Sequence, residues 1–304
     1  MQAFDDFDPV IGVAEELEEG LRRIVAPNPS PMTYKGTNTY ILGAKDLAVI
    51  DPGPDSAEHL EAILSCLEPQ QRVTHIIVTH SHKDHSPLAR ALSKATGAPV
   101  LAFGDSTAGR SEVMRSLAET GYQGGGEGVD HAFTPDRVVT DGQSFFGSGW
   151  TLKVMHAPGH MGNHICLKWK DCCFTADHVM GWASSLVSPP DGDLTDFMTS
   201  CDELAANQWR AFYPGHGDVI RSPNDRLEWL INHRKEREAS VLRALKDGPM
   251  SVSDLTRIIY ADTPIHLHAA AQRNVFAHLI DLHQKNIVRQ SGRLDPDKVF
   301  ERIA

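Results

Sequence analysis

The sequence lacks any long hydrophobic run, since no stretch approaches the roughly 18 consecutive apolar residues that indicate a membrane span. Its first residues, MQAFDDFDPVIG, are acidic and contain no basic segment followed by an apolar one. We therefore expect neither a secretory signal nor a membrane partner. Cysteine is also scarce: there are five residues, an odd number, with no Cys-x-x-Cys spacing. This argues against a disulfide framework and favours a cytoplasmic location.

Positive charge is scarce as well, with 29 Lys and Arg against 40 Asp and Glu and a net charge of −11. The balance is uneven along the chain. Residues 226–304 hold 13 basic and 10 acidic side chains, whereas the first 225 residues hold 16 and 30. An acidic body disfavours broad, sequence-independent contact with phosphates, so no DNA partner is expected. Metal cations in a small site would still attract an anion locally.

The composition that is present, with 304 residues of which 41% are hydrophobic, is that of a globular protein with a large core. Short apolar runs alternate with helical patterns, which indicates an α/β fold. The segment Arg-Ser-Pro-Asn near residue 225 interrupts this pattern. We therefore predict a first domain over residues 1–225 and a second over residues 226–304.

The second domain is predicted to be winged-helix-like. Helical patterns cover residues 227–245, 252–260 and 267–284, and a hairpin follows around Ser291 and Gly292. Winged helices often bind nucleic acid, but the helix that would read it carries only Arg273 and Lys285. Packing or homodimer formation is therefore favoured over nucleic-acid binding for this domain.

The most informative segment is Thr-His-Ser-His-Lys-Asp-His-Ser at residues 79–86, which follows an apolar strand and precedes a Ser-Pro helix start. In an extended segment, alternate residues share a face, so His80, His82 and Asp84 can point to one side. Two such imidazoles can chelate one ion, while Asp84 and His85 serve a second. Imidazole and carboxylate without thiolate suit Zn²⁺ in an open catalytic site, with Mn²⁺ or Fe²⁺ as alternatives.

Three later segments repeat this arrangement of an apolar strand that ends in a polar turn. His160 follows the strand near residues 153–156, Asp177 follows residues 172–175, and His216 follows residues 211–213. The four strand ends are expected to open on the same edge of a sandwich.

With these residues the sequence resembles the metallo-β-lactamase superfamily. The resemblance implies an αββα sandwich with a two-metal site at one edge of the sheets. It also implies a role for each residue: His80, His82 and His160 at the first metal, Asp84, His85 and His216 at the second, Asp177 as the bridge, and Asp51 as a support for the ligands.

A weaker resemblance rests on Gly-Thr-Asn-Thr-Tyr at residues 36–40, Tyr-Pro-Gly-His-Gly at residues 213–217 and the His233-Arg234 helix. These segments are similar to the beta-lactamase-like protein 2 subgroup, to which glyoxalase II, a thioester hydrolase, is related. The subgroup implies cleavage of single-stranded RNA.

The mechanism expected from such a site is hydrolysis by a hydroxide that bridges two Zn²⁺ ions, since the ions lower the pKa of a bound water toward ~7. Asp84 would orient this hydroxide and pass a proton to the leaving group. Asn38, His164 and His178 are expected to support the ligands or the substrate without binding metal. Trp182 is expected either to line the pocket or to pack in the core.

Several substrate classes are compatible with such a site. A phosphodiester, as in single-stranded RNA, comes first because of the subgroup resemblance. The acidic body favours a small molecule, such as the thioester or ester of a glyoxalase II-type reaction, and a β-lactam comes third. A non-catalytic, metal-stabilised interaction protein is disfavoured because all seven ligand positions and Asp51 are present.

Overall fold

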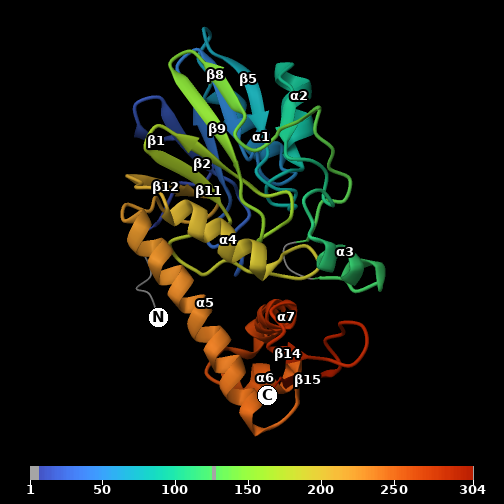
Figure 1. Ribbon diagram of the computed structural model, residues 1–304. Coiled ribbons are helices and arrows are strands. Elements are labelled where there is room, and N and C mark those ends of the chain that lie inside the picture. The colour runs from blue at the N-terminus through green and yellow to red at the C-terminus, as the bar shows by residue number, and fades with distance from the viewer. Residues whose placement is uncertain (1–6, 125–127, 304) are drawn as a thin grey trace.

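The computed structural model describes residues 7–124 and 128–303, which form a larger lobe of sheets and a smaller lobe of helices. Figure 1 shows the larger lobe at the top and the smaller one below, with the long helix α5 running from one to the other. None of the helices in these two ranges is long and apolar enough to cross a lipid bilayer.

The first sheet of the larger lobe is antiparallel over its first four strands and parallel over the rest. Its order equals the chain order: β1 (Glu15–Glu18), β2 (Leu21–Val25), β3 (Asn38–Leu42), β4 (Asp46–Ile50), β5 (Arg72–Ile77), β6 (Val100–Ala102) and β7 (Arg137–Val138). The helices α1 (Ala57–Ser65) and α2 (Leu88–Thr96) cover its outer face. Ile63 and Leu92 from these helices pack against Ile41 and Ile76 of the sheet.

The second sheet has the order β12 (Ala211–Pro214), β11 (Cys172–Ala176), β10 (Ile165–Trp169), β9 (Trp150–His156) and β8 (Ser144–Gly147). Its outer face is covered by α4 (Leu194–Ala205) and by the first half of α5 (Pro223–Ala244). The adjacent Cys172 and Cys173 are both buried, and their side chains lie in different cores on the two faces of β11.

The two sheets face each other across the central core, to which each contributes the inward side chains of its strands. Leu42, Ile50 and Ile77 from the first sheet meet Leu167 and Phe174 from the second, and all are buried. Helix, sheet, sheet and helix therefore form four layers, so the predicted αββα sandwich is confirmed.

The smaller lobe contains the second half of α5 together with α6 (Val252–Ile259) and α7 (His268–Gln284), and a sheet of order β13 (Met250–Ser251), β15 (Val299–Arg302) and β14 (Val288–Arg289). The predicted winged-helix arrangement of three helices and a hairpin is confirmed. Its core also takes in Met114 and Leu117 of α3 (Glu112–Glu119), a helix of the larger lobe that packs against α7.

The sequence patterns missed five described strands, namely β1, β2, β7, β8 and β13. They also placed the start of the long helix at residue 227, whereas α5 begins at Pro223, where proline is well suited to the first helical turn. The boundary predicted after residue 225 thus falls just inside α5, and it stays a prediction.

Candidate metal centre

The seven predicted ligand residues come together at one edge of the sandwich, where four strands end. Residues 80–85 follow β5, His160 follows β9, Asp177 follows β11 and His216 follows β12. All seven side chains are buried. They form two groups, in each of which the ligand atoms lie within 4.8 Å of one another: His80, His82 and His160 in the first, and Asp84, His85, Asp177 and His216 in the second.

The first group is a triangle of imidazole nitrogens. His82 Nδ1 lies 3.0 Å from His80 Nε2 and 3.1 Å from His160 Nε2. In each of the three pairs that these imidazole rings form, the two ring planes are nearly perpendicular, at 80° to 85°. Three nitrogens at such spacing from different directions match the three-His face of a tetrahedral Zn²⁺ site.

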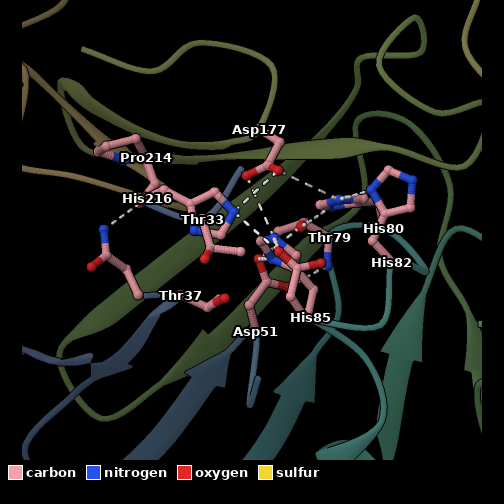
Figure 2. A network of polar contacts seen from close by, with 12 residues as sticks. Thr33, Thr37, Asp51, Thr79, His80, His82, His85, Asp177, Pro214 and His216 are labelled. Atoms are coloured by element: carbon pink, nitrogen blue, oxygen red, sulfur yellow. Dashed lines mark hydrogen bonds and ion pairs between the residues drawn. The ribbon is translucent and has the colours of Figure 1, made fainter. Parts of the chain in front are cut away.

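The second group brings two imidazoles against two carboxylates. His216 Nε2 lies 3.2 Å from Asp84 Oδ2 and 3.3 Å from Asp177 Oδ2, while His85 Nε2 lies 3.4 Å from Asp84 Oδ2 and 3.5 Å from Asp177 Oδ1. Asp177 Oδ2 is also 3.7 Å from His160 Nε2 in the first group. Asp177 therefore lies between the two groups, as Figure 2 shows.

The remaining ring nitrogen of most of these histidines is held by a neighbouring oxygen, which fixes the orientation of the imidazole. His160 Nδ1 lies 2.7 Å from the Leu186 carbonyl, His216 Nδ1 is 3.1 Å from the Gly36 carbonyl, and His80 Nδ1 is 3.0 Å from the Thr79 hydroxyl. When Nδ1 donates to an oxygen, Nε2 carries the lone pair and faces the group.

Asp51 lies behind both groups and holds two of their members. Its Oδ2 accepts from the Thr79 hydroxyl at 2.7 Å and lies 3.0 Å from His85 Nδ1, and its Oδ1 accepts from the Thr79 backbone N–H at 2.7 Å. Figure 2 shows this network below the two groups. Because Thr79 in turn contacts His80, one buried carboxylate orients a histidine of each group.

Many polar atoms that face the centre have no hydrogen-bond partner among the described residues, although they are buried. These atoms are both carboxylate oxygens of Asp84, Oδ1 of Asp177, and Nε2 of His85 and of His216. A buried polar atom without a partner costs about 1–3 kcal/mol, and more when it is charged. Divalent cations would satisfy all of these atoms, so the residues present fit a pair of metal ions.

The electrostatics of the two groups differ. Burial, helped by neighbouring imidazoles, lowers the pKa of His82 to about 3 and that of His80 well below its usual value, so both rings are neutral at pH 7. Burial also lowers the pKa of His216, but Asp177 and Asp84 outweigh it and raise that pKa to about 10. The second group therefore carries protons that a cation would displace.

Three further predicted residues lie close to the groups without joining them. Asn38 donates through Nδ2 to the carbonyls of Pro214 and Gly217, at 2.9 and 2.8 Å, and so holds the turn that carries His216. The fully buried ring of His164 packs 5.0 Å from that of His80. His178 lies one layer further back, with Nε2 3.5 Å from the Cys201 thiol.

Three cavities reach the centre, and the first and third of them lie between the two lobes. One of about 720 Å³ is lined by Lys83, Asp84 and Arg273, and one of about 500 Å³ by His82 and His160. The third, of about 260 Å³, touches His160 and Asp177 and is otherwise largely apolar. We call it the apolar chamber, and its walls include Met32, Met180, Trp182, Leu186, Leu267 and Ala271.

Trp182 therefore lines this chamber, and its ring also stacks on that of Tyr34, with centroids 5.0 Å apart. The sequence patterns missed the contribution of the smaller lobe, since α7 supplies a wall to the cavities through Ala270 and Ala271. They also missed the backbone carbonyls of Gly36 and Leu186, for which a side-chain motif gives no signal.

Comparison with known proteins identifies the fold and the family. The family model described as the metallo-beta-lactamase superfamily matches residues 32–216, and that of the beta-lactamase associated winged helix domain matches residues 251–298. The chain belongs to the metallo-β-lactamase superfamily. It is therefore a member of a hydrolase superfamily, with a centre suited to metal ions.

Individual relatives support this assignment over the whole chain. Proteins named beta-lactamase-like protein 2 homolog are 28% identical in Drosophila melanogaster, covering 95% of this chain and 96% of the relative, and 30% identical in Caenorhabditis elegans, covering 90% and 88%. An Aspergillus fumigatus protein named atrochrysone carboxyl ACP thioesterase is 30% identical over 79% of this chain and 69% of its own. The crystal structure of a beta-lactamase domain protein from Burkholderia ambifaria shares the fold, with a TM-score of 0.80, 21% identity and coverage of 98% and 96%.

Proposed function

We propose that this protein is a hydrolase with two Zn²⁺ ions, held by His80, His82 and His160 on one side and by Asp84, His85 and His216 on the other, with Asp177 shared. The observation that carries the proposal is the convergence of buried ligand atoms that lack hydrogen-bond partners among the described residues. The donor set of nitrogens and carboxylate oxygens, without thiolate, favours zinc, and Mn²⁺ or Fe²⁺ would also accept it.

Bound there, two such cations would supply Lewis-acid polarisation of the substrate and a water that ionises near neutral pH. The protein contributes orientation and proton transfer. Asp84 is the one ligand carboxylate that also lines the large cavity of about 720 Å³. Its Oδ2 faces His85 and His216, and its Oδ1 has no hydrogen-bond donor among the described residues. Asp84 Oδ1 is thus placed to hold a proton and pass it to the leaving group.

For the substrate, we propose a thioester or related ester with an apolar acyl group. The apolar chamber supports this assignment, because it adjoins Asp177 and His160 and offers a water-excluding site next to the reacting bond. Its volume of about 260 Å³ suits a single acyl group better than a polymer. The thioesterase name of a relative that is 30% identical points the same way.

A phosphodiester, as in single-stranded RNA, is the second candidate. It is favoured by Lys83 and Arg273, which line the cavity next to Asp84 and would attract a phosphate. The net charge of −11 opposes long contacts with a polyanion, so a short phosphodiester fits this cavity better than a long RNA. A β-lactam stays third, because it gives the smaller lobe no role. The five free cysteines are consistent with action in the cytoplasm.

The test begins with metal analysis of the purified protein, for which we expect two equivalents per chain. The zinc-loaded protein is then assayed on acyl thioesters of increasing chain length, S-lactoylglutathione, single-stranded RNA, a chromogenic phosphodiester and a chromogenic cephalosporin. We expect turnover of the thioesters, and turnover confined to the phosphodiesters would refute the proposed substrate class.

Two variants separate the candidates. Ala183→Asp places a charge in the wall of the apolar chamber and not in the cavity of Lys83, and it should raise the KM for long acyl thioesters while leaving that for acetyl thioesters little changed. Lys83→Met removes a cation from the neighbouring cavity and should matter only for a phosphodiester substrate. If the lysine variant lowers turnover and the variant in the apolar chamber does not, the phosphodiester is favoured over the thioester.

A further inference from the structure

One loop performs two tasks at the metal centre. Residues 178–187 belong to the connection between β11 and α4 and contain no helix or strand. The carbonyl of Leu186 in this loop orients His160, whose Nδ1 lies 2.7 Å away. Side chains of the same loop, among them Met180 and Trp182, form a wall of the apolar chamber. The position of the loop therefore affects both the first ligand group and the chamber.

Two buried arginines on α5 hold this loop. Arg226 donates from Nε to the Met180 carbonyl and from Nη2 to the Ala183 carbonyl, both at 2.7 Å. Arg234 lies two turns further along the helix and donates from Nη2 to the Ser185 carbonyl. Ser185 immediately precedes Leu186, so Arg234 holds the peptide next to the carbonyl that orients His160.

Arg234 also joins this loop to the smaller lobe. Its Nη1 donates to Asn274 Oδ1 on α7 at 3.1 Å, and the same oxygen accepts from the Val187 backbone N–H at 3.3 Å. Asn274 and Arg234 thus fix the residues on both sides of Leu186. One guanidinium connects α5, α7 and the loop.

The environment of Arg234 is unusual for a charged group. Arg234 is 2% exposed, and among the described residues it donates to two amide carbonyl oxygens, those of Ser185 and Asn274, and to no carboxylate. Its guanidinium lies 5.2 Å from the centre of the Phe197 ring. Burial lowers the pKa of this group, since a buried cation without a counter-ion is costly. An apolar side chain would avoid that cost, so the position is explained by the need for a planar, forked donor.

We propose that Arg234 is a positioning residue, which fixes the loop and through Leu186 the orientation of His160 in the first ligand group. The proposal rests on the proposed function only in that His160 binds a metal ion. It assigns the smaller lobe a role in building the centre, because Asn274 of α7 shares the contact.

The test compares Arg234→Met and Arg234→Lys with the matched control Arg237→Met. Arg237 lies one turn further along α5, and its contacts with described residues are in the smaller lobe, to the Ile259 carbonyl and the Tyr260 ring. For each protein we would measure the dissociation constants of two Zn²⁺ ions by competition with a chromophoric chelator. We would also record the visible spectrum of the Co²⁺ form and the thermal unfolding midpoint.

We expect both Arg234 variants to bind the ion of the first group about tenfold more weakly and to show an altered Co²⁺ spectrum, since partners of metal ligands typically contribute 10- to 100-fold in affinity. Lysine keeps the charge but not the fork, so Arg234→Lys should not restore the spectrum. If Arg234→Met fails to fold, Arg234→Lys carries the test. Arg237→Met should bind both ions like the wild type.

Wild-type affinity and spectrum in a folded Arg234 variant would overturn the proposal. Equal losses in Arg237→Met would also overturn it, because they would show a general effect of packing on α5. Neither readout depends on the substrate. If the wild type hydrolyses no thioester while Arg234→Lys still loses affinity, the proposed substrate fails and the role of Arg234 stands.

Discussion

Replacing Asp51 by Asn tests how the two ligand groups are oriented. In the wild type, Asp51 Oδ2 faces the Thr79 hydroxyl at 2.7 Å and His85 Nδ1 at 3.0 Å. An amide NH₂ at this position is itself a donor, so it would face the Thr79 hydroxyl and His85 Nδ1–H with no acceptor between them. The conflict is relieved if His85 moves its proton to Nε2, but Nε2 is then unable to bind a metal ion.

The magnitude follows from the contacts. A hydrogen bond to a charged group contributes about 1.5–3 kcal/mol, which corresponds to about 10- to 100-fold in an equilibrium constant. We therefore expect Asp51→Asn to lower the affinity for the metal ion of the second group, which contains His85, by about 10- to 100-fold. Thr79→Val leaves Asp51 and His85 in contact but removes the hydroxyl that donates to Asp51 Oδ2 and contacts His80 Nδ1. This variant should lower the affinity for the metal ion of the first group by about tenfold.

The assay is a titration of metal-free protein with Zn²⁺ in the presence of a competing chelator, which yields two dissociation constants. Reference variants His160→Ala and His216→Ala each lack one ligand and assign the constants to the two groups. Thr256→Val, a buried threonine of α6 that donates only within its helix, controls for loss of a buried hydroxyl. Wild-type constants for Asp51→Asn would refute the orientation argument, as would equal losses in Thr256→Val.

Three further predictions concern activity, metal removal and pH. Asp84→Asn should retain at least the first metal ion but lose most turnover, and near-normal kcat would count against its proton-transfer role. Stripping the metal with a chelator should lower Tm by several degrees and zinc should restore it, because ligand binding stabilises the folded state; an unchanged Tm would contradict this. Burial, together with Asp193, raises the pKa of Asp196 from its usual value of 3.8 to about 6, so this group lowers the stability of the fold as pH rises from about 4 to 6, and the loss is complete above pH 6. Asp196→Asn should thus raise the free energy of unfolding at pH 8 by about 1 kcal/mol, after allowance for solvent screening, and leave it unchanged at pH 4. Denaturant unfolding at both pH values measures this, with the exposed Asp202→Asn on the same helix as control. Equal effects of Asp196→Asn at the two pH values would refute the prediction.

The parts of the fold that could be predicted are those in which a local pattern decides the structure. The apolar runs of β5, β9, β11 and β12 each end in a turn with His or Asp, and this pattern located the candidate ligands. The strand β1 could not be found in this way, since its sequence Glu-Glu-Leu-Glu has no apolar alternation. It is held by partners outside its own sequence, as in the ion pair of Glu15 with Arg23 on β2 and that of Glu18 with the distant Arg210.

The surroundings of the centre were also beyond sequence reasoning where they depend on the backbone. The carbonyls of Gly36 and Leu186 orient His216 and His160, and any residue type supplies a carbonyl. The role of Arg234 depends on α5 and the loop 178–187 lying side by side, which no spacing along the chain encodes. Charged residues were therefore recognised as ligands only where they share a short motif or follow a strand.

The continuity of α5 has a consequence for how the molecule unfolds. Leu227 and Leu230 in its first half belong to the core of the larger lobe, while Val241 and Ala244 in its second half belong to that of the smaller lobe. Because α5 is one unbroken helix of 22 residues, unfolding of either core removes support from the half of the helix that packs in the other. The protein should thus melt in one cooperative transition, and a fragment that ends at residue 225 would expose apolar surface and aggregate.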